Sequence, residues 1–165
     1  MSFIGIVSDT KSEKIINNIL KNRLEKDKNI ITINEKSIVN MKNIKFETIL
    51  IANSNKIAKE YREALENIIV NTKYLILNAD IAIDLKIEKE NELSVVTYGF
   101  NPKATITASS VEENILLCIQ RKIVDINKRQ IEQQEIKISV FDNMEININD
   151  IIAVATILLL YGKII

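Results

Sequence analysis

The sequence predicts an α/β fold, on three observations. In the first half of the chain, short apolar segments alternate with amphipathic helical patterns, which is typical of βαβ units that build a parallel sheet. From Ser94 to Phe141, strand-like segments are separated by polar turns, without a clear helical pattern. The segment Ile151–Tyr161 is apolar on almost every side, which indicates a helix buried by more than one element. We therefore expect a parallel sheet of about four strands with helices, continued by an antiparallel β part, with the last helix packed on the parallel strands.

The first half contains the predicted parallel strands and two predicted helices. The strands are nearly continuous apolar runs, as expected for strands covered on both faces, and lie at Phe3–Val7, Asn29–Ile33, Thr48–Ala52 and Tyr74–Leu77. The first helix is expected from Lys11 to about Lys26. The second follows Ser54, which can cap it. Its inner face is formed by apolar residues at helical spacing, namely Ile57, Tyr61, Leu65, Ile68 and Ile69.

The second half is predicted to be mostly β. The expected strands are Ser94–Tyr98, Ala104–Ser109, Ile115–Gln120 and Glu135–Phe141. A turn is expected at Phe100–Lys103, because Pro102 fixes a turn φ and cannot donate to a ladder. Lys122–Asn127 fits either a further strand or a hairpin arm. For the final helix, Asn149 or Asp150 can serve as the N-cap and Gly162 as the C-terminal stop.

Composition excludes several classes of function. The length of 165 residues predicts a single domain, residues 1–165. Because 22 basic residues balance 22 acidic ones, we expect neither nucleic acid nor a membrane surface as a partner. The absence of histidine excludes a catalytic triad and any His-ligated metal. The single cysteine, Cys118, lies in an apolar strand and is expected to be an inert, buried thiol. With no signal peptide and no long apolar span, we expect a cytoplasmic protein.

Four segments resemble parts of the central, ATP-binding domain of the Mur ligase family. The run Tyr74–Asp80 ends in Asn-Ala-Asp and is followed by Val95–Phe100 and Ala104–Ala108, which are similar to the next two strands of that domain. The segment Asn147–Gly162 resembles its helix with a Leu-Leu-Gly ending. The resemblance implies a P-loop-like sheet. It also implies that Asn78, Asp80 and Asn147 are remnants of a nucleotide site, although asparagines at strand and helix ends also satisfy backbone groups.

The phosphate loop of that family is not present here. Its Gly-Thr-x-Gly-Lys-Thr motif would lie on Ser8–Glu13, where both glycines are missing, Ser12 replaces the lysine and Glu13 replaces the magnesium-binding threonine. Thr10 and Glu13 instead fit a capping box, in which Thr10 caps the helix and Glu13 reaches back to its N–H. Lys11 is the remaining candidate for a phosphate contact.

The metal ligands and flanking domains of that family also lack counterparts. Glu35 is the one match for its metal-binding glutamate. Asp80 and Asp84 could form a metal-binding pair after a parallel strand, but loop carboxylates facing water are the simpler interpretation. The basic residues Arg121, Lys122, Lys128 and Arg129 indicate a solvated edge. We expect no metal site, no catalytic residue and no resident cofactor.

These observations predict a non-catalytic, stand-alone Mur-ligase-like domain that acts as a binding or scaffolding protein. The alternative is a nucleotide-binding module that retains weak affinity for ATP and magnesium and works with a separate partner chain. A third interpretation is an enzyme of another class that uses carboxylates. We expect a homodimer or a complex with another protein. Two apolar segments are candidates for the contact: the tail Tyr161–Ile165, unless it packs on the core of the domain itself, and the residues Ile131, Ile136 and Ile138.

Overall fold

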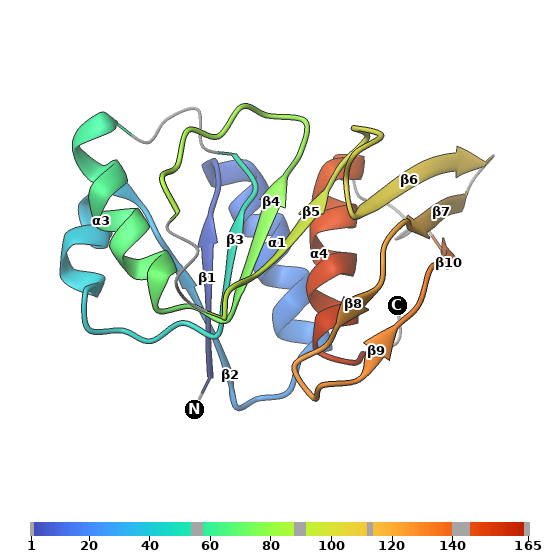
Figure 1. Cartoon of the computed structure of the whole chain (residues 1–165), viewed down its shortest axis with the longest axis horizontal. Coiled ribbons are helices and arrows are strands. Elements are labelled where there is room, and N and C mark those ends of the chain that lie inside the picture. The colour runs from blue at the N-terminus through green and yellow to red at the C-terminus, as the bar shows by residue number, and fades with distance from the viewer. Residues whose placement is uncertain (1, 54–57, 88–91, 112–113, 140–145, 164–165) are drawn as a thin grey trace.

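A central eight-stranded sheet organises the computed structural model, which describes residues 2–53, 58–87, 92–111, 114–139 and 146–163. The strand order is β10-β7-β6-β5-β4-β3-β1-β2 (Figure 1). A separate two-stranded pair is formed by β8 and β9. The strand bounds are β1 (Ser2–Val7), β2 (Lys28–Thr32), β3 (Thr48–Ile51), β4 (Tyr74–Asn78), β5 (Ser94–Tyr98), β6 (Ile106–Val111), β7 (Asn114–Ile119), β8 (Ile123–Val124), β9 (Gln130–Ile131) and β10 (Gln134–Ser139).

The parallel part of the sheet extends further than expected. Strands β2, β1, β3, β4 and β5 pair in parallel, and β6 joins β5 in parallel through the single pair Tyr98–Ile106. In this sheet, antiparallel pairing joins β6 to β7 and β7 to β10. The expectation that antiparallel pairing begins at Ser94 was therefore wrong. Parallel neighbours need a long crossover, usually a helix. The crossover between Asn78 and Ser94 has no helix in its described residues, so the sequence pattern gave no signal of it.

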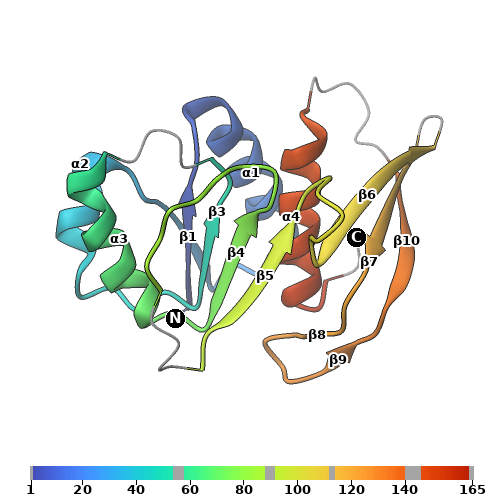
Figure 2. The same ribbon diagram turned by 45° about the horizontal axis from the view of Figure 1, so that its top comes forward.

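Helices cover the two faces of the parallel sheet. The helices are α1 (Thr10–Arg23), α2 (Glu35–Ile38), the short 3-10 helix η1 (Val39–Met41), α3 (Lys59–Val70) and α4 (Ile148–Leu160). Helices α1 and α4 lie beside each other on one face, and α2 and α3 lie on the opposite face (Figures 1 and 2). Each face has its own apolar core, one centred on α1 and α4 and the other on α3. Ser54 and Ile57, expected at the start of the second helix, lie outside the described residues, and α3 begins after Ala58.

Helix α4 packs as the sequence predicts. Eleven of its thirteen residues, the uninterrupted run Asp150–Leu160, are buried, and the helix contacts α1, β4, β5 and β6. Its N-cap is Asn147, whose side chain accepts from the Asn149 N–H at 3.0 Å, so neither Asn149 nor Asp150 caps it. The helix ends in a Schellman motif around Gly162, which has φ +65°.

The segment Lys122–Asn127 forms a hairpin arm, one of its two expected alternatives. Strand β8 pairs antiparallel with β9, and the arm attaches to the main domain through buried Asp125 and the backbone. The Ile126 N–H donates to the Leu160 carbonyl at 2.9 Å, and the Tyr74 hydroxyl donates to the Asp125 carbonyl at 2.9 Å. These bonds hold the arm between β4 and the end of α4.

The three isoleucines proposed as an apolar patch on the antiparallel part are buried to different degrees, and a contact through them stays a prediction. Ile138 is buried, and Ile131 and Ile136 are partly buried against the core beside α4. Ile164 and Ile165 lie outside the described residues, so the tail contact stays a prediction. Among the described helices, none combines the length and apolar character needed to span a bilayer.

Candidate functional site

The candidate site lies where the parallel strands end and α1 begins. Open α/β sheets bind their ligands in this region, outside the carboxyl ends of the strands. Asp9 follows β1, Asn53 follows β3, and Asn78 ends β4. Asp150, in the first turn of α4, acts on the same groups at the start of α1. These are the residues that an anion would meet here.

The carboxylate of Asp9 occupies the N-terminus of α1. Its Oδ1 accepts hydrogen bonds from the backbone N–H groups of Lys11 and Ser12, both at 3.0 Å. Residue 9 is extended, with φ −70° and ψ 161°, so Asp9 is the N-cap. The capping box expected from Thr10 and Glu13 was wrong, because Glu13 accepts from the Thr32 hydroxyl instead, at 2.5 Å. Two amides that a phosphate would need are therefore bonded to a side chain of the chain itself.

The hydrogen bonds to Asp9 favour its ionised form. The Ser12 N–H is the main cause that lowers the pKa of Asp9 below its ordinary value; burial opposes the shift, and Asn53 and the Lys11 N–H reinforce it. The helix N-terminus carries a partial positive charge that also favours an anion at this point. The site therefore already contains the negative charge that its electrostatics favour.

Asp150 places a second carboxyl group close to the same helix end. Its side chain is buried, with a relative exposure of 5%. Burial is the main cause that raises the pKa of Asp150, and the negative charge of Asp9 raises this pKa further. A hydrogen bond with Ser12 and the positive charge of Lys11 act in the opposite direction and lower this pKa. An incoming phosphate would meet Asp9 directly and Asp150 behind it, and both repel an anion when ionised.

Replacing Asp9 with alanine is expected to cost roughly 0.5–2 kcal/mol of unfolding free energy at neutral pH, the usual range for a lost N-cap. Because the pKa of Asp9 is lower in the folded state, its contribution is present above the ordinary value of 3.8 and is lost as pH falls through the folded value. Urea unfolding at pH 7 and at pH 3 measures both effects. Asp27→Ala removes the same charge from an exposed carboxylate, which lies 3.6 Å from the ammonium of the mostly buried Lys28 side chain, and should change little; equal effects for the two variants would contradict the capping role.

Lys11, the candidate phosphate contact, is exposed in the first turn of α1. Burial is the main cause that raises the pKa of Asp150, and the positive charge of Lys11 opposes this rise. In this position, Lys11 offsets negative charge that the chain itself provides.

Asn78 and Asp80 hold neighbouring strand ends together. The Asn78 side chain donates to the Ala52 carbonyl at 3.2 Å and accepts from the Asp80 N–H at 2.9 Å. The Asp80 carboxylate accepts from the N–H groups of Phe100 and Asn101, at 2.9 and 2.7 Å. Gly99 has φ +133°, and a Cβ there would lie 2.6 Å from that carboxylate. These contacts explain both side chains without a ligand, and their nucleotide-binding role stays a prediction.

The remaining candidates also have structural partners. Asn147 caps α4, and Glu35 accepts from the Ala58 N–H at 3.1 Å, at the start of α3. Asp84 forms an exposed ion pair with Arg62, whereas Asp80 accepts from the backbone of Phe100 and Asn101. The two carboxylates therefore bind different groups. Within the described ranges, no three Asp, Glu or Cys side chains come together in a way that could hold a metal ion.

The Cys118 thiol is half-buried and lies 3.9 Å from the Glu135 carboxylate. Burial is the main cause that raises its pKa, and Glu135 adds to the shift. A thiol with a raised pKa is a poor nucleophile at neutral pH. This environment agrees with the low reactivity expected from the sequence, but the thiol is half-buried rather than buried, because Cys118 lies on the face of the sheet opposite α4.

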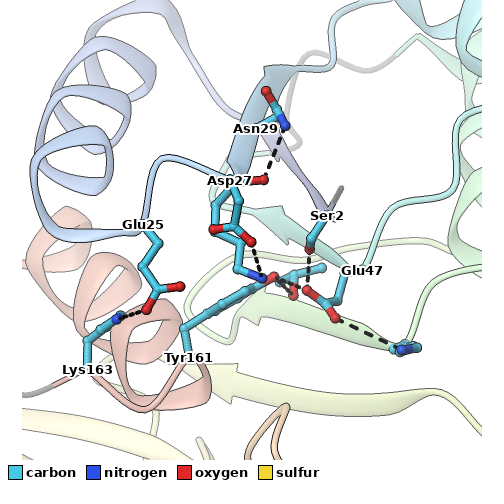
Figure 3. A network of polar contacts seen from close by, with 10 residues as sticks. Ser2, Glu25, Asp27, Asn29, Glu47, Tyr161 and Lys163 are labelled. Atoms are coloured by element: carbon cyan, nitrogen blue, oxygen red, sulfur yellow. Dashed lines mark hydrogen bonds and ion pairs between the residues drawn. The ribbon is translucent and has the colours of Figure 1, made fainter.

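A second polar cluster lies at the opposite, amino ends of the strands (Figure 3). The Glu47 carboxylate accepts from the Ser2 hydroxyl and from the Tyr161 hydroxyl, the latter at 3.2 Å, and the Tyr161 hydroxyl lies 2.9 Å from that of Thr48. Burial raises the pKa of Tyr161, so its hydroxyl is neutral at physiological pH. Sequence reasoning missed this cluster, because residues 47 and 161 are distant in the chain and neither belongs to a motif.

A cavity of about 770 Å³ opens beside this cluster. Its lining includes charged side chains of both signs, Glu47, Glu92, Lys73 and Lys128, and the exposed Val124. Lys73 lies 4.0 Å from Glu47, so part of this charge is neutralised internally. The lining also includes the hydroxyl-bearing residues Thr72, Tyr74 and Ser94.

Comparison with known proteins shows a likeness of fold. No family model and no curated protein matches the chain. The crystal structure of MurF from Acinetobacter baumannii aligns with 98% of this chain and 43% of its own, with a TM-score of 0.56 and 9% sequence identity. The chain thus spans less than half the length of MurF. At this identity the likeness concerns the fold alone, and the fold of the chain is Mur-ligase-like.

Proposed function

We propose that this chain is a non-catalytic domain of Mur-ligase-like fold that acts by binding another protein. The observation that carries the proposal is the hydrogen bonding of the Asp9 carboxylate to the Lys11 and Ser12 amides at the start of α1. A nucleotide phosphate would need these same donors. The other polar groups at the strand ends, Asn78 and Asp80, hold the backbone in place.

The energetics of phosphate binding oppose a nucleotide at this helix end. ATP would have to displace Asp9 from two amides and leave its carboxylate without them, and an unmade bond to a charged group is costly. The triphosphate would then lie beside Asp9 and near Asp150. Two like charges about 4 Å apart repel by roughly 1 kcal/mol in water and by several times more where water is partly excluded.

A calorimetric titration with ATP and magnesium tests this proposal against its alternative, a nucleotide-binding module. We expect no saturable binding by the wild-type chain up to millimolar nucleotide. A dissociation constant near 1 μM, about −8 kcal/mol, would overturn the proposal and favour the module. Asp9→Ala frees two amides and removes one charge, so any residual affinity should be higher in that variant. Asp27→Ala, which removes one charge elsewhere, should leave it unchanged.

The proposed binding role rests on the fact that the polar groups at the strand ends already have partners within the chain. The carboxylates of Asp9 and Asp80 accept from backbone N–H groups, and the Asn78 side chain donates to a backbone carbonyl. A selected role then depends on a surface that another chain can recognise. The balanced net charge favours a protein over nucleic acid or an anionic membrane as the partner. A cytoplasmic location is part of this proposal.

A further inference from the structure

Strand β10 is an edge of the sheet: in the part of the chain that the structure describes, no strand pairs with its outer side. It is the outermost strand beyond β7 in the strand order and in Figure 2. It has six residues, contains no proline and pairs with β7 along its whole length without a bulge. Native proteins usually shorten, bend or cover such an edge, because its unpaired N–H and C=O groups can pair with another strand.

The hydrogen-bond pattern shows which groups of β10 face outward. The Gln120 N–H donates to the Thr105 carbonyl, so residue 120 and every second residue before it in β7 direct their backbone groups toward β6. The intervening residues of β7 bond to β10, where their partners are Gln134, Ile136 and Ile138. It follows that the N–H and C=O groups of Glu135 and Lys137 point away from β7, toward the free edge.

The side chains of this edge are complementary to a second copy of themselves. Glu135 and Lys137 are both exposed and project from the same face of the sheet, since they lie two residues apart on one strand. The 3.9 Å contact between Glu135 and Cys118 fixes that face as the one that α4 does not cover. In an antiparallel pairing of two β10 strands about a twofold axis at Ile136, Glu135 faces the partner's Lys137, and the pair occurs twice.

This register also provides hydrogen-bond partners for the outward backbone N–H and C=O groups of β10. The residues opposite each other, Glu135 and the partner's Lys137, are the ones with outward N–H and C=O groups, as a hydrogen-bonded antiparallel pair requires. A shift of the twofold axis by one residue would oppose two lysines or two glutamates, and directly opposed like charges are destabilising. At the axis, the partly buried Ile136 meets its own copy on the face shared with α4.

We propose that β10 is a homodimerisation edge, at which two copies of this chain join their sheets into one continuous sheet. The inference rests on the proposed binding role and names the partner as a second copy. A monomeric chain that binds no ATP would refute this edge and leave the binding role intact.

A charge-swap series tests the edge. Sedimentation equilibrium of the full chain at micromolar concentrations should give a dimer for the wild type. Lys137→Glu and Glu135→Lys each replace two attractions with two repulsions, and each should raise the dimer dissociation constant at least about tenfold. The double variant Glu135→Lys/Lys137→Glu restores opposite charges and should restore the dimer. An equimolar mixture of the two single variants should form a heterodimer.

A backbone variant supplies an independent readout. Lys137→Pro removes an N–H that points away from β7, so the chain should stay folded by circular dichroism but become monomeric, since edge strands tolerate proline at such a position. A wild-type chain that is monomeric at about 100 μM would overturn the proposal. A dimer that survives both single swaps unchanged would also overturn it, because the contact would then lie on another surface.

Discussion

Replacing Asp125 with alanine should destabilise the fold by roughly 2–4 kcal/mol, because it removes a buried carboxylate that accepts three hydrogen bonds, two of them from Arg129. The Asp125 side chain is almost fully buried, and its carboxylate accepts from the Asn127 N–H, the Arg129 N–H and the Arg129 Nε, all at 2.8 Å. Burial opposes its ionisation, but the bonds from Arg129 and Asn127 outweigh burial, so the pKa of Asp125 is lowered. The side chain thereby fixes the turn of the β8–β9 arm.

Urea unfolding of the Asp125→Ala variant measures this effect, with Asp84→Ala as the matched control. Asp84 also pairs with an arginine, Arg62, but it is exposed, and exposed ion pairs contribute about 1 kcal/mol or less. Similar losses for the two variants would show that Asp125 does not organise the arm.

Truncating Ile152 to alanine should cost about 2–5 kcal/mol, the range for removing a large aliphatic side chain from a closed core. Ile152 is fully buried on α4, in the core that α4 shares with α1 and the sheet. Because α4 packs on both, the surrounding side chains have little room to relax into the cavity. Chemical denaturation of the variant gives the loss directly.

Two further variants separate packing from general effects of substitution. Ile152→Val removes one methylene group and should cost about 0.5–1.5 kcal/mol. Val124→Ala alters an exposed side chain and should stay within about 0.5 kcal/mol of the wild type. A loss for Ile152→Ala no larger than that for Val124→Ala would mean that α4 is not the centre of this core.

The sequence predicted the fold class correctly from elements whose own residues show a clear hydrophobic pattern. Runs such as Tyr74–Leu77 are apolar on both faces and form central parallel strands, and Ile151–Tyr161 is a buried helix. The pairing of Ser94–Tyr98 could not be predicted in this way, because a parallel and an antiparallel strand share the same alternation. Its direction depends on the path of the crossover, which carries no helical pattern.

At the candidate site, the sequence predicted some local features and not others. The missing glycines of Ser8–Glu13 favour a loop that does not hold phosphate, which stays a prediction, and the sequence favoured Thr10 as the cap. The structure has Asp9 there, since the helix begins one residue after the carboxylate. Contacts between distant residues, such as Tyr161 with Thr48 and Glu47, depend on how the sheet and α4 pack and have no local signal.

The most direct test of the central claim follows the backbone amides of Lys11 and Ser12 by NMR during a titration with ATP and magnesium. If the Asp9 carboxylate holds these amides, their chemical shifts should stay unchanged up to millimolar nucleotide. They should move only under acid, as pH falls through the lowered pKa of Asp9. Saturable shifts of both amides with ATP at neutral pH would contradict the account, because they would place a phosphate where the structure has Asp9.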